Sequence, residues 1–275
     1  MTQSTTALAP GAVIGIMGGG QLGRMSAVAA AKLGFKVHVF TQNVTDPAVE
    51  VAHAVTLAPY DSPEALESFA RAVDVVTFEF ENITADALDL LARHCPVRPS
   101  GRVLRTSQDR LEEKTFLASI GIPLAPWHPV TARADLQTAM DTLGLPLILK
   151  TAQEGYDGKG QRRVHHPDDL NTAFDELAPH PLVAEGMVDF ACELSVMVIR
   201  GVDGTILCFD TVQNRHWHGF LDLTLAPAPV TVETPHHAHA LPFLLAEAFY
   251  PLRLMGGGMS FVSRCCSPCS IVALC

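Results

Sequence analysis

A glycine-rich segment at residues 150–161 carries the side chains best suited to phosphate chemistry. Between positions 155 and 160, three glycines alternate with a tyrosine, an aspartate and a lysine. Glycines let the backbone turn sharply and bring its N–H groups against an anion. Lys150 and Lys159 add two positive charges, so the segment suits the β- and γ-phosphates of a nucleotide. The spacing is not that of a Walker A loop, and a glycine-rich hairpin turn with solvated lysines is the alternative.

A second glycine-rich turn, residues 18–23, follows an apolar run and precedes a helical segment. Its G-x-G-x-x-G spacing brings a ligand close to the N–H groups at a helix start, where the helix dipole favours phosphate. A dinucleotide site requires an acid after the second strand, but Thr41 and Gln42 stand there. The turn therefore predicts a site for a single phosphate or a small polar group. The alternative is a tight βα turn without a ligand.

Two acids end the strand-like run at residues 75–82. Period two places Glu79 and Glu81 on the same face as Val75 and Thr77. Ligands of open α/β sheets bind at the carboxyl ends of the strands, which favours a functional site here. The alternative is that both carboxylates cap the next helix or face water.

Two domains of different fold class are predicted to position these residues. Strand and helix patterns alternate four times over residues 13–94, which predicts an α/β domain with a doubly wound parallel sheet. Beyond the break at residues 96–101, helical segments alternate with paired strands and predict an α+β unit. The predicted ranges are a disordered lead-in over 1–12, a first domain over 13–100, a second domain over 101–250 and a tail over 251–275.

Three features of the second domain have ordinary interpretations. The charged run at residues 108–114 is typical of a solvated helix face. Strands at 193–200 and 205–212 form a hairpin, and residues 213–216 end that sheet. A lone histidine such as His216 is more often a packed or surface residue than a catalytic one.

Composition narrows the function classes. The 275 residues carry a net charge of -10, which argues against a protein that grips nucleic-acid phosphates. Residues 1–12 lack the features of a signal peptide, and no apolar run is long enough to span a membrane. We therefore expect a cytoplasmic protein with no nucleic-acid or membrane partner.

Five motifs occur together and in order, and they resemble one family. They are Gly18–Met25, Thr77–Asn82, Asp109–Lys114, Gly155–Gln161 and Glu193–Ser195. Over about residues 13–248 the chain is similar to N5-carboxyaminoimidazole ribonucleotide synthetase, an ATP-grasp ligase of purine biosynthesis. The resemblance implies a pre-ATP-grasp domain followed by an ATP-grasp domain with a lid at about 127–184. It also implies a homodimer.

The resemblance implies a reaction and its cofactors. Such a ligase uses ATP, Mg²⁺ and bicarbonate to form carboxyphosphate, which carboxylates the amino nitrogen of 5-aminoimidazole ribonucleotide. The implied ATP contacts are Arg110, Lys150, the loop residues Gly155, Tyr156, Asp157, Gly158, Lys159, Gly160 and Gln161, the hinge residues Glu185, Gly186, Met187 and Val188, and Glu193 and His216.

The resemblance also assigns the remaining roles. Asp157, Lys159 and His216 become the catalytic residues. The implied contacts to the aminoimidazole ribonucleotide are Gly20, Gln21, Leu22 and Glu79. The first glycine turn is then a substrate site, which agrees with its missing dinucleotide acid.

The resemblance stops near residue 250. The tail contains Cys265, Cys266, Cys269 and Cys275 in place of the carboxylates that bind metal in the family. A metal site is one interpretation, but a second C-x-x-C arm at zinc spacing is missing. The other interpretation is a frameshifted or truncated reading frame whose tail lacks strand and helix periodicity. No metal ligand is therefore predicted, and the domain is expected to be incomplete and poorly active.

Two alternative functions stay open. One is another ATP-grasp carboxylate–amine ligase, although the motifs at residues 18–25 and 77–82 speak against it. The other is an inactive relic that binds ATP without turning it over.

Overall fold

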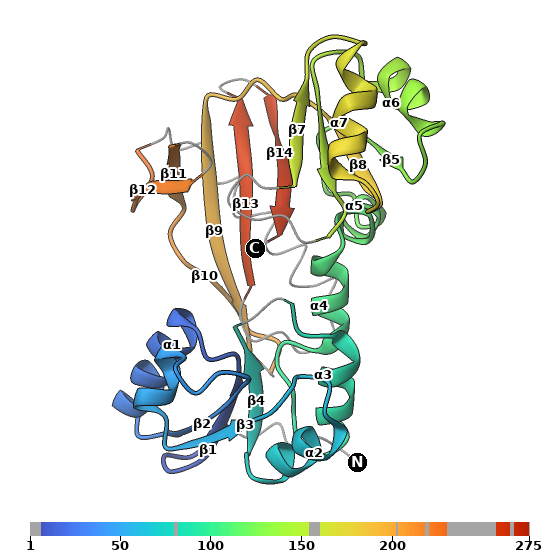
Figure 1. Cartoon of the computed structure of the whole chain (residues 1–275). Helices are drawn as coiled ribbons and strands as arrows, with labels where there is room; N and C mark the ends of the chain where they lie inside the picture. Colours follow the sequence, from blue (N-terminus) through green and yellow to red (C-terminus); the bar gives the residue numbers. More distant parts are fainter. Residues whose placement is uncertain are drawn as a thin grey trace. The chain divides into compact units, whose positions relative to one another are not determined.

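The computed structural model describes residues 7–79, 82–153, 160–201, 203–217, 220–229, 257–264 and 267–274. The chain divides into two compact units, the first holding most of residues 1–105 and the second most of residues 106–275 (Figure 1). None of the helices in these described ranges is both long and apolar enough to cross a membrane.

The first unit is built on a four-stranded parallel sheet, as the sequence predicts. Its strands are β1 (Val13–Met17), β2 (Lys36–Thr41), β3 (Ala54–Leu57) and β4 (Val75–Phe78), in the order β3-β2-β1-β4. The order reverses next to β1, so the carboxyl ends of β1 and β4 lie together. The glycine turn after β1 and Glu79 after β4 therefore meet at one edge.

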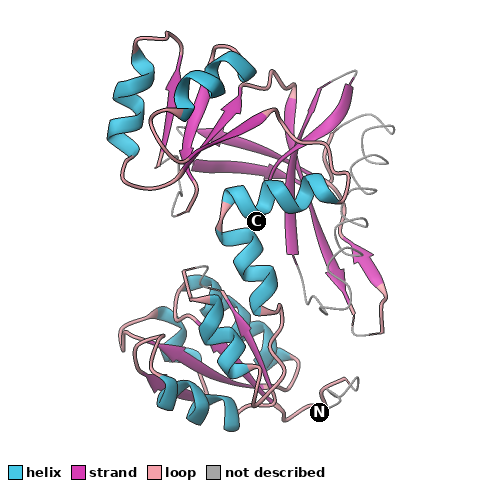
Figure 2. Ribbon diagram, turned by 90° about the vertical axis from the view of Figure 1, so that its right-hand side faces the viewer, coloured by secondary structure: helices cyan, strands magenta, loops and turns pink. Residues whose placement is uncertain are grey.

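Helices cover both faces of this sheet (Figure 2). They are α1 (Gln21–Lys32), the short 3₁₀ helix η1 (Pro47–Val51), α2 (Pro63–Arg71) and α3 (Ala85–Leu91). Buried residues of α1 pack with Ile16 and Val39 on one face, whereas those of α2 and α3 pack with Met17 and Phe40 on the other. The two clusters show why β1 and β2 read as nearly continuous apolar runs.

The second unit contains an antiparallel sheet that carries the predicted phosphate loop. Its strands are β5 (Trp127–Val130), β6 (Leu147–Thr151), β7 (Gln161–Val164) and β8 (Leu182–Gly186), in the order β5-β8-β6-β7. Helices α6 (Asp135–Leu143) and α7 (Asp169–Leu177) pack on one face, against Leu147 and Leu149 of β6. The alternate residues of β6 therefore point away from this core.

The helical segment expected around residues 108–114 is two helices. They are α4 (Gly101–Gln108) and α5 (Arg110–Ser119). Asp109 separates them because its side chain accepts hydrogen bonds from the backbone N–H groups of Leu111 and Glu112, at 2.8 and 3.3 Å. An aspartate that caps a helix in this way begins a new helix.

A larger antiparallel sheet completes the second unit. Its strands are β9 (Cys192–Arg200), β10 (Ile206–Cys208), β11 (Val212–Trp217), β12 (Phe220–Leu225), β13 (Gly257–Arg264) and β14 (Ser267–Leu274). The expectation that residues 213–216 end the sheet is wrong, because they belong to β11 and pair with both β9 and β12.

The tail forms two strands, although its sequence shows no strand periodicity. Strand β13 pairs with β9 over Gly257–Ser263, and β14 pairs with β13. Backbone pairing explains the difference, since one side of β9 offers N–H and C=O groups to any extended segment whatever its side-chain pattern. Cys269 lies within β14, whereas Cys265, Cys266 and Cys275 lie outside the described residues.

Candidate functional site

Lys150 and Glu185 form the centre of a charged cluster in the second unit. Lys150 lies on β6 and Glu185 on the adjacent strand β8, where Ile148 is the direct partner of Glu185. Residues diagonal to one another across two strands lie within reach of long side chains. The Lys150 ammonium lies 2.7 Å from Glu185 Oε2, on the face away from the α6 and α7 core.

Lys114 completes this cluster from helix α5. Its ammonium lies 2.9 Å from Glu185 Oε1, and its side chain is only 1% exposed. The interpretation of residues 108–114 as a solvated face is therefore wrong for Lys114 and for the buried Glu113. A period-3.6 pattern identifies the buried side of a helix only when that side is apolar, so no local pattern indicates this ion pair.

The two ammonium groups control the ionisation of Glu185. Burial by itself would raise the pKa of this carboxyl, but Lys150 and then Lys114 oppose that effect, and the pKa is lowered from 4.5. Glu185 is therefore an anion at neutral pH, held between two cations. The three groups sum to one positive charge, and Lys150, 15% exposed, is the member that reaches the surface.

Arg110 is fixed beside the end of β6. Its backbone N–H donates to the carbonyl of Ala152 at 2.8 Å, and its guanidinium donates to the carbonyl of Thr151 at 2.9 Å. Asp109, which caps the same helix, also accepts a hydrogen bond from the Gln153 amide at 3.0 Å. The helix start is thereby tied to the strand that leads into the predicted phosphate loop.

Most of that loop lies outside the described residues. The part left out includes Gly155, Tyr156, Asp157, Gly158 and Lys159. That this segment cradles phosphates therefore stays a prediction. Gly160 is described, and it accepts a hydrogen bond from the Thr151 N–H at 2.8 Å. Gln161 begins β7 and pairs with Lys150 of β6.

The predicted hinge spans the end of β8, with Glu185 and Gly186 in the strand and Met187 and Val188 beyond it. The Gly186 N–H donates to the carbonyl of Pro126 at 2.8 Å, and the Met187 N–H lies 3.4 Å from the carbonyl of Pro146. Met187 is exposed, and Val188 follows it in an irregular segment. The segment thus leaves the sheet at the buried cluster and offers apolar surface beyond it.

Glu193 lies in a polar group on the larger sheet. Glu193 of β9 faces Asn214 of β11, whose amide donates to Glu193 Oε1 at 3.3 Å and to Ser195 Oγ at 2.6 Å. His216 Nδ1 lies 3.4 Å from Glu193 Oε2. The structure therefore brings the two predicted residues Glu193 and His216 into contact, and the histidine is not an isolated residue.

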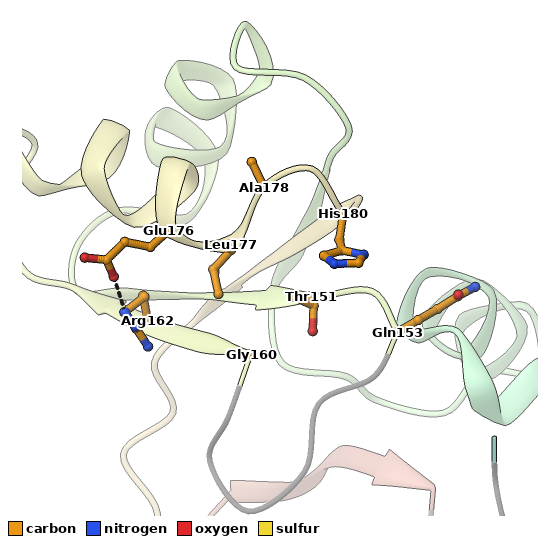
Figure 3. Close-up of a pocket in the computed structure, with 8 residues that line it drawn as sticks. All are labelled: Thr151, Gln153, Gly160, Arg162, Glu176, Leu177, Ala178 and His180. Carbon is orange, nitrogen blue, oxygen red and sulfur yellow. Dashed lines mark hydrogen bonds and ion pairs between the residues drawn. The ribbon is translucent and has the colours of Figure 1, made fainter.

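A pocket of about 300 Å³ lies at the base of the predicted loop (Figure 3). Arg162 and Glu176 form an ion pair on one side of it, and His180 and Gln153 lie on the other. Of the predicted binding residues that the structure describes, Gly160 lines this pocket. The charged cluster at Glu185 and the group at Glu193 are therefore separate from it.

In the first unit, Glu79 closes the start of helix α1. The Gly20 N–H donates to Glu79 Oε1 at 2.7 Å, so the carboxylate takes the position that an anion would take at this helix start. Gly18 has φ +114°, and a Cβ there would lie 2.8 Å from Glu79 Oε1. Gln21 and Leu22 begin α1 and are exposed, while Glu81 lies outside the described residues.

Sequence reasoning missed a second set of polar groups at this turn. The Thr41 hydroxyl donates to Asp46, and a Cβ on Gly19 would lie 2.7 Å from Thr41 Oγ1. Burial raises the pKa of Tyr60, and a hydrogen bond with Thr41 partly opposes this effect. The negative charges of Asp46 and Glu79 raise the pKa further. In the sequence these residues are marked only by their positions: Thr41 ends β2, Asp46 follows β2 and Tyr60 follows β3, at the same edge as Glu79.

The described residues hold no group of three or more His, Cys, Asp or Glu side chains able to bind a metal ion.

Two family models match the chain. The ribonucleotide synthetase preATP-grasp domain matches residues 12–108, and the ATP-grasp domain matches residues 115–256.

A curated relative is similar over most of the chain. The N5-carboxyaminoimidazole ribonucleotide synthase of Brucella melitensis is 40% identical over 253 residues, which cover 91% of this chain and 70% of that protein. The chain spans between 59% and 70% of the length of the first curated synthases it matches. It spans 24% of a longer bifunctional purine synthesis protein from Dictyostelium discoideum.

Two solved structures share the fold. An N5-carboxyaminoimidazole ribonucleotide synthetase in complex with ADP has a TM-score of 0.94 at 33% identity, covering 100% of this chain and 72% of that one. The Aspergillus clavatus synthase, solved with ADP and 5-aminoimidazole ribonucleotide, has a TM-score of 0.87 at 28% identity, with coverages of 96% and 69%.

Proposed function

The chain belongs to the N5-carboxyaminoimidazole ribonucleotide synthetase family of ATP-grasp proteins, and we propose that it carboxylates 5-aminoimidazole ribonucleotide with ATP and bicarbonate. A bicarbonate oxygen attacks the γ-phosphorus of ATP, which releases ADP and forms carboxyphosphate. The amino nitrogen of the ribonucleotide then attacks the carboxyl carbon and loses a proton. Phosphate leaves, and the product is the N5-carboxyamino ribonucleotide.

The charged cluster of the second unit supports the nucleotide part of this proposal. Lys150 presents the excess positive charge of a buried ion cluster at the strand that leads to the glycine loop. Arg110 is anchored to the end of the same strand. Both cations are held by neighbouring groups before a ligand arrives, which lowers the ordering cost of binding a phosphate chain.

The ribose and adenine contacts follow from the next two groups. Glu193 offers carboxylate oxygens that can accept hydrogen bonds from two ribose hydroxyls, and Asn214 and His216 fix its orientation. The segment from Glu185 to Val188 supplies backbone groups for the adenine edge and the exposed Met187 side chain for its face. In this scheme His216 acts beside the nucleotide and touches the reacting phosphates.

The glycine turn of the first unit is assigned to the aminoimidazole ribonucleotide. Because the Gly20 N–H already donates to Glu79, the turn is better suited to a ligand that donates hydrogen bonds than to a phosphate. Glu79 and Asp46 supply acceptors for an amino group, while Gly20, Gln21 and Leu22 lie at the helix start beside it. An aminoimidazole has that donor character.

The remaining roles belong to residues outside the described ranges. Asp157 and Lys159 are proposed to act on bicarbonate and on the transferred phosphoryl group, and Tyr156 belongs to the same loop. When bound, Mg²⁺ would neutralise the negative charge that develops on the ATP phosphates. The part of the chain that the structure describes holds no group of three or more His, Cys, Asp or Glu side chains that could bind it. The homodimer, the cytoplasmic location and the domain limits at residues 100 and 250 also remain proposals.

The observation that carries the proposal is the net positive cluster of Lys114, Glu185 and Lys150 next to the loop. The test is ADP formation by the purified chain with ATP, with bicarbonate and the ribonucleotide each omitted in turn. The proposal expects ADP formation that requires both. ADP formation at a rate that depends on neither substrate would refute the proposal. ATP binding without turnover would favour the nucleotide-binding alternative.

A further inference from the structure

Lys114 is a buried cation to which the proposed reaction assigns no task. Its side chain is 1% exposed, so it cannot contact a nucleotide from the surface. A buried ammonium without a partner is strongly destabilised. Here the carboxylate of Glu185 lies 2.9 Å from the Lys114 ammonium and is its partner.

Glu185 is shared, and the sharing determines how Lys150 behaves. One carboxylate oxygen lies 2.9 Å from Lys114 and the other 2.7 Å from Lys150. If Lys114 were neutral, Glu185 and Lys150 would form a closed pair with no net charge. With Lys114 present, the cluster keeps one positive charge, and Lys150 is its partly exposed member.

The charges that act on Glu185 come from its two lysine neighbours, Lys150 and Lys114, among the residues that the structure describes. Glu113, the buried acid beside Lys114 on α5, has an interaction of its own and is not among them.

We propose that Lys114 is a positioning residue for nucleotide binding, which neutralises Glu185 so that the charge of Lys150 remains available to the nucleotide phosphates. This inference rests on the proposed function, because it requires a nucleotide at Lys150. It differs from a packing role, in which Lys114 would only fill the space between α5 and β8.

The test measures ADP affinity by calorimetric titration of the purified chain and three variants. Lys114→Met removes the charge, and the cluster falls from one net positive charge to none. Lys114→Arg keeps the charge. The double variant Lys114→Met with Glu185→Gln removes both buried charges and leaves Lys150 with its positive charge unopposed. Circular dichroism of each variant establishes that it is folded.

Loss of one charge at a phosphate site predicts that Lys114→Met binds ADP about tenfold more weakly. Lys114→Arg is expected to bind within about threefold of the parent chain. The double variant is expected to regain most of the affinity that Lys114→Met loses, since Glu185→Gln leaves in place the backbone groups assigned to adenine. A packing role predicts instead that the double variant, which perturbs the same contact twice, binds no better than Lys114→Met.

The outcomes separate the inference from the proposed function. The inference alone is overturned if the parent chain binds ADP and Lys114→Met binds it equally well. It is also overturned if the double variant does not regain the affinity that Lys114→Met loses. A folded parent chain that does not bind ADP overturns the proposed function, and the inference with it. Should Lys114→Met fail to fold, the comparison of the parent with the double variant still decides, since recovery is predicted there.

Discussion

Replacing Glu185 by glutamine is expected to destabilise the second unit by about 3 kcal/mol. The substitution keeps the size of the side chain and removes its negative charge. Lys114 and Lys150 then face each other without a counter-ion, in a region where their side chains are 1% and 15% exposed. The expected loss is a large part of the stability of a typical domain.

The magnitude follows from burial. Removing one partner of a buried ion pair costs about 3–5 kcal/mol, because the remaining charge stays desolvated. The lower end applies here, since the glutamine oxygen can still accept a hydrogen bond from one ammonium and Lys150 can turn towards water. Lys114→Met should cost less than Glu185→Gln, because Glu185 keeps Lys150 as its partner.

Urea unfolding followed by tryptophan fluorescence measures this change. The chain has two tryptophans, Trp127 of β5 and Trp217 of β11, and both belong to the second unit. Glu176→Gln is the matched control, because it removes the same charge from the Arg162 pair, whose side chains are 50% and 47% exposed. Exposed pairs contribute less than about 1 kcal/mol, so the control should barely shift the midpoint.

The pH dependence of the unfolding free energy tests the same ion cluster independently. The pKa of Glu185 is lowered from 4.5 in the folded chain, so its ionisation stabilises the fold fully above that value. This contribution is lost as the pH falls through the folded pKa, and the difference between the parent and Glu185→Gln should shrink below pH 4.5. Equal losses for Glu185→Gln and Glu176→Gln, or a difference that does not change with pH, would show that Glu185 is not a buried counter-ion of the two lysines.

Three further changes test other parts of the structure. Gly18→Ala is expected to lower the free energy of unfolding by about 1–2 kcal/mol more than Gly11→Ala, as measured by thermal melts. Both glycines have positive φ, but of the two only Gly18 would place a Cβ against Glu79. Equal losses would contradict the close packing of that turn. Burial raises the pKa of Cys95 from 9.0 to about 11, so iodoacetamide at pH 8 should modify Cys95 about 100-fold more slowly in the folded chain than in urea, as read by peptide mass spectrometry; equal rates would show that the thiol is not buried. Glu193→Gln should reduce the preference for ADP over 2′-deoxy-ADP by about tenfold, since a charged acceptor for a ribose hydroxyl is lost, and an unchanged preference would remove Glu193 from the ribose site.

Periodicity predicted most of the scaffold. Strand and helix patterns over residues 13–94 predicted a parallel sheet, and β1, β2, β3 and β4 form one there. These features depend on neighbours in the sequence, so a local pattern contains the necessary information.

Tertiary partners determine what the sequence could not show. Strand β11 and the tail strands exist because β9 and β12 offer backbone partners, not because of an alternating pattern. Lys114 reads as a surface residue until Glu185, 71 positions away, is brought against it. Glu79, in contrast, was predicted at a functional edge because the ends of parallel strands meet there by geometry, and it does contact the glycine turn.

The transfer of oxygen from bicarbonate to phosphate distinguishes carboxyphosphate formation from simple hydrolysis of ATP. The purified chain is incubated with ATP, 5-aminoimidazole ribonucleotide and bicarbonate labelled with oxygen-18, and the released phosphate is analysed by mass spectrometry. The bridging oxygen of carboxyphosphate comes from bicarbonate and leaves with the phosphate, so the account predicts one labelled oxygen in each phosphate. Phosphate that forms without the label would mean that water attacks ATP, and it would contradict the proposed reaction.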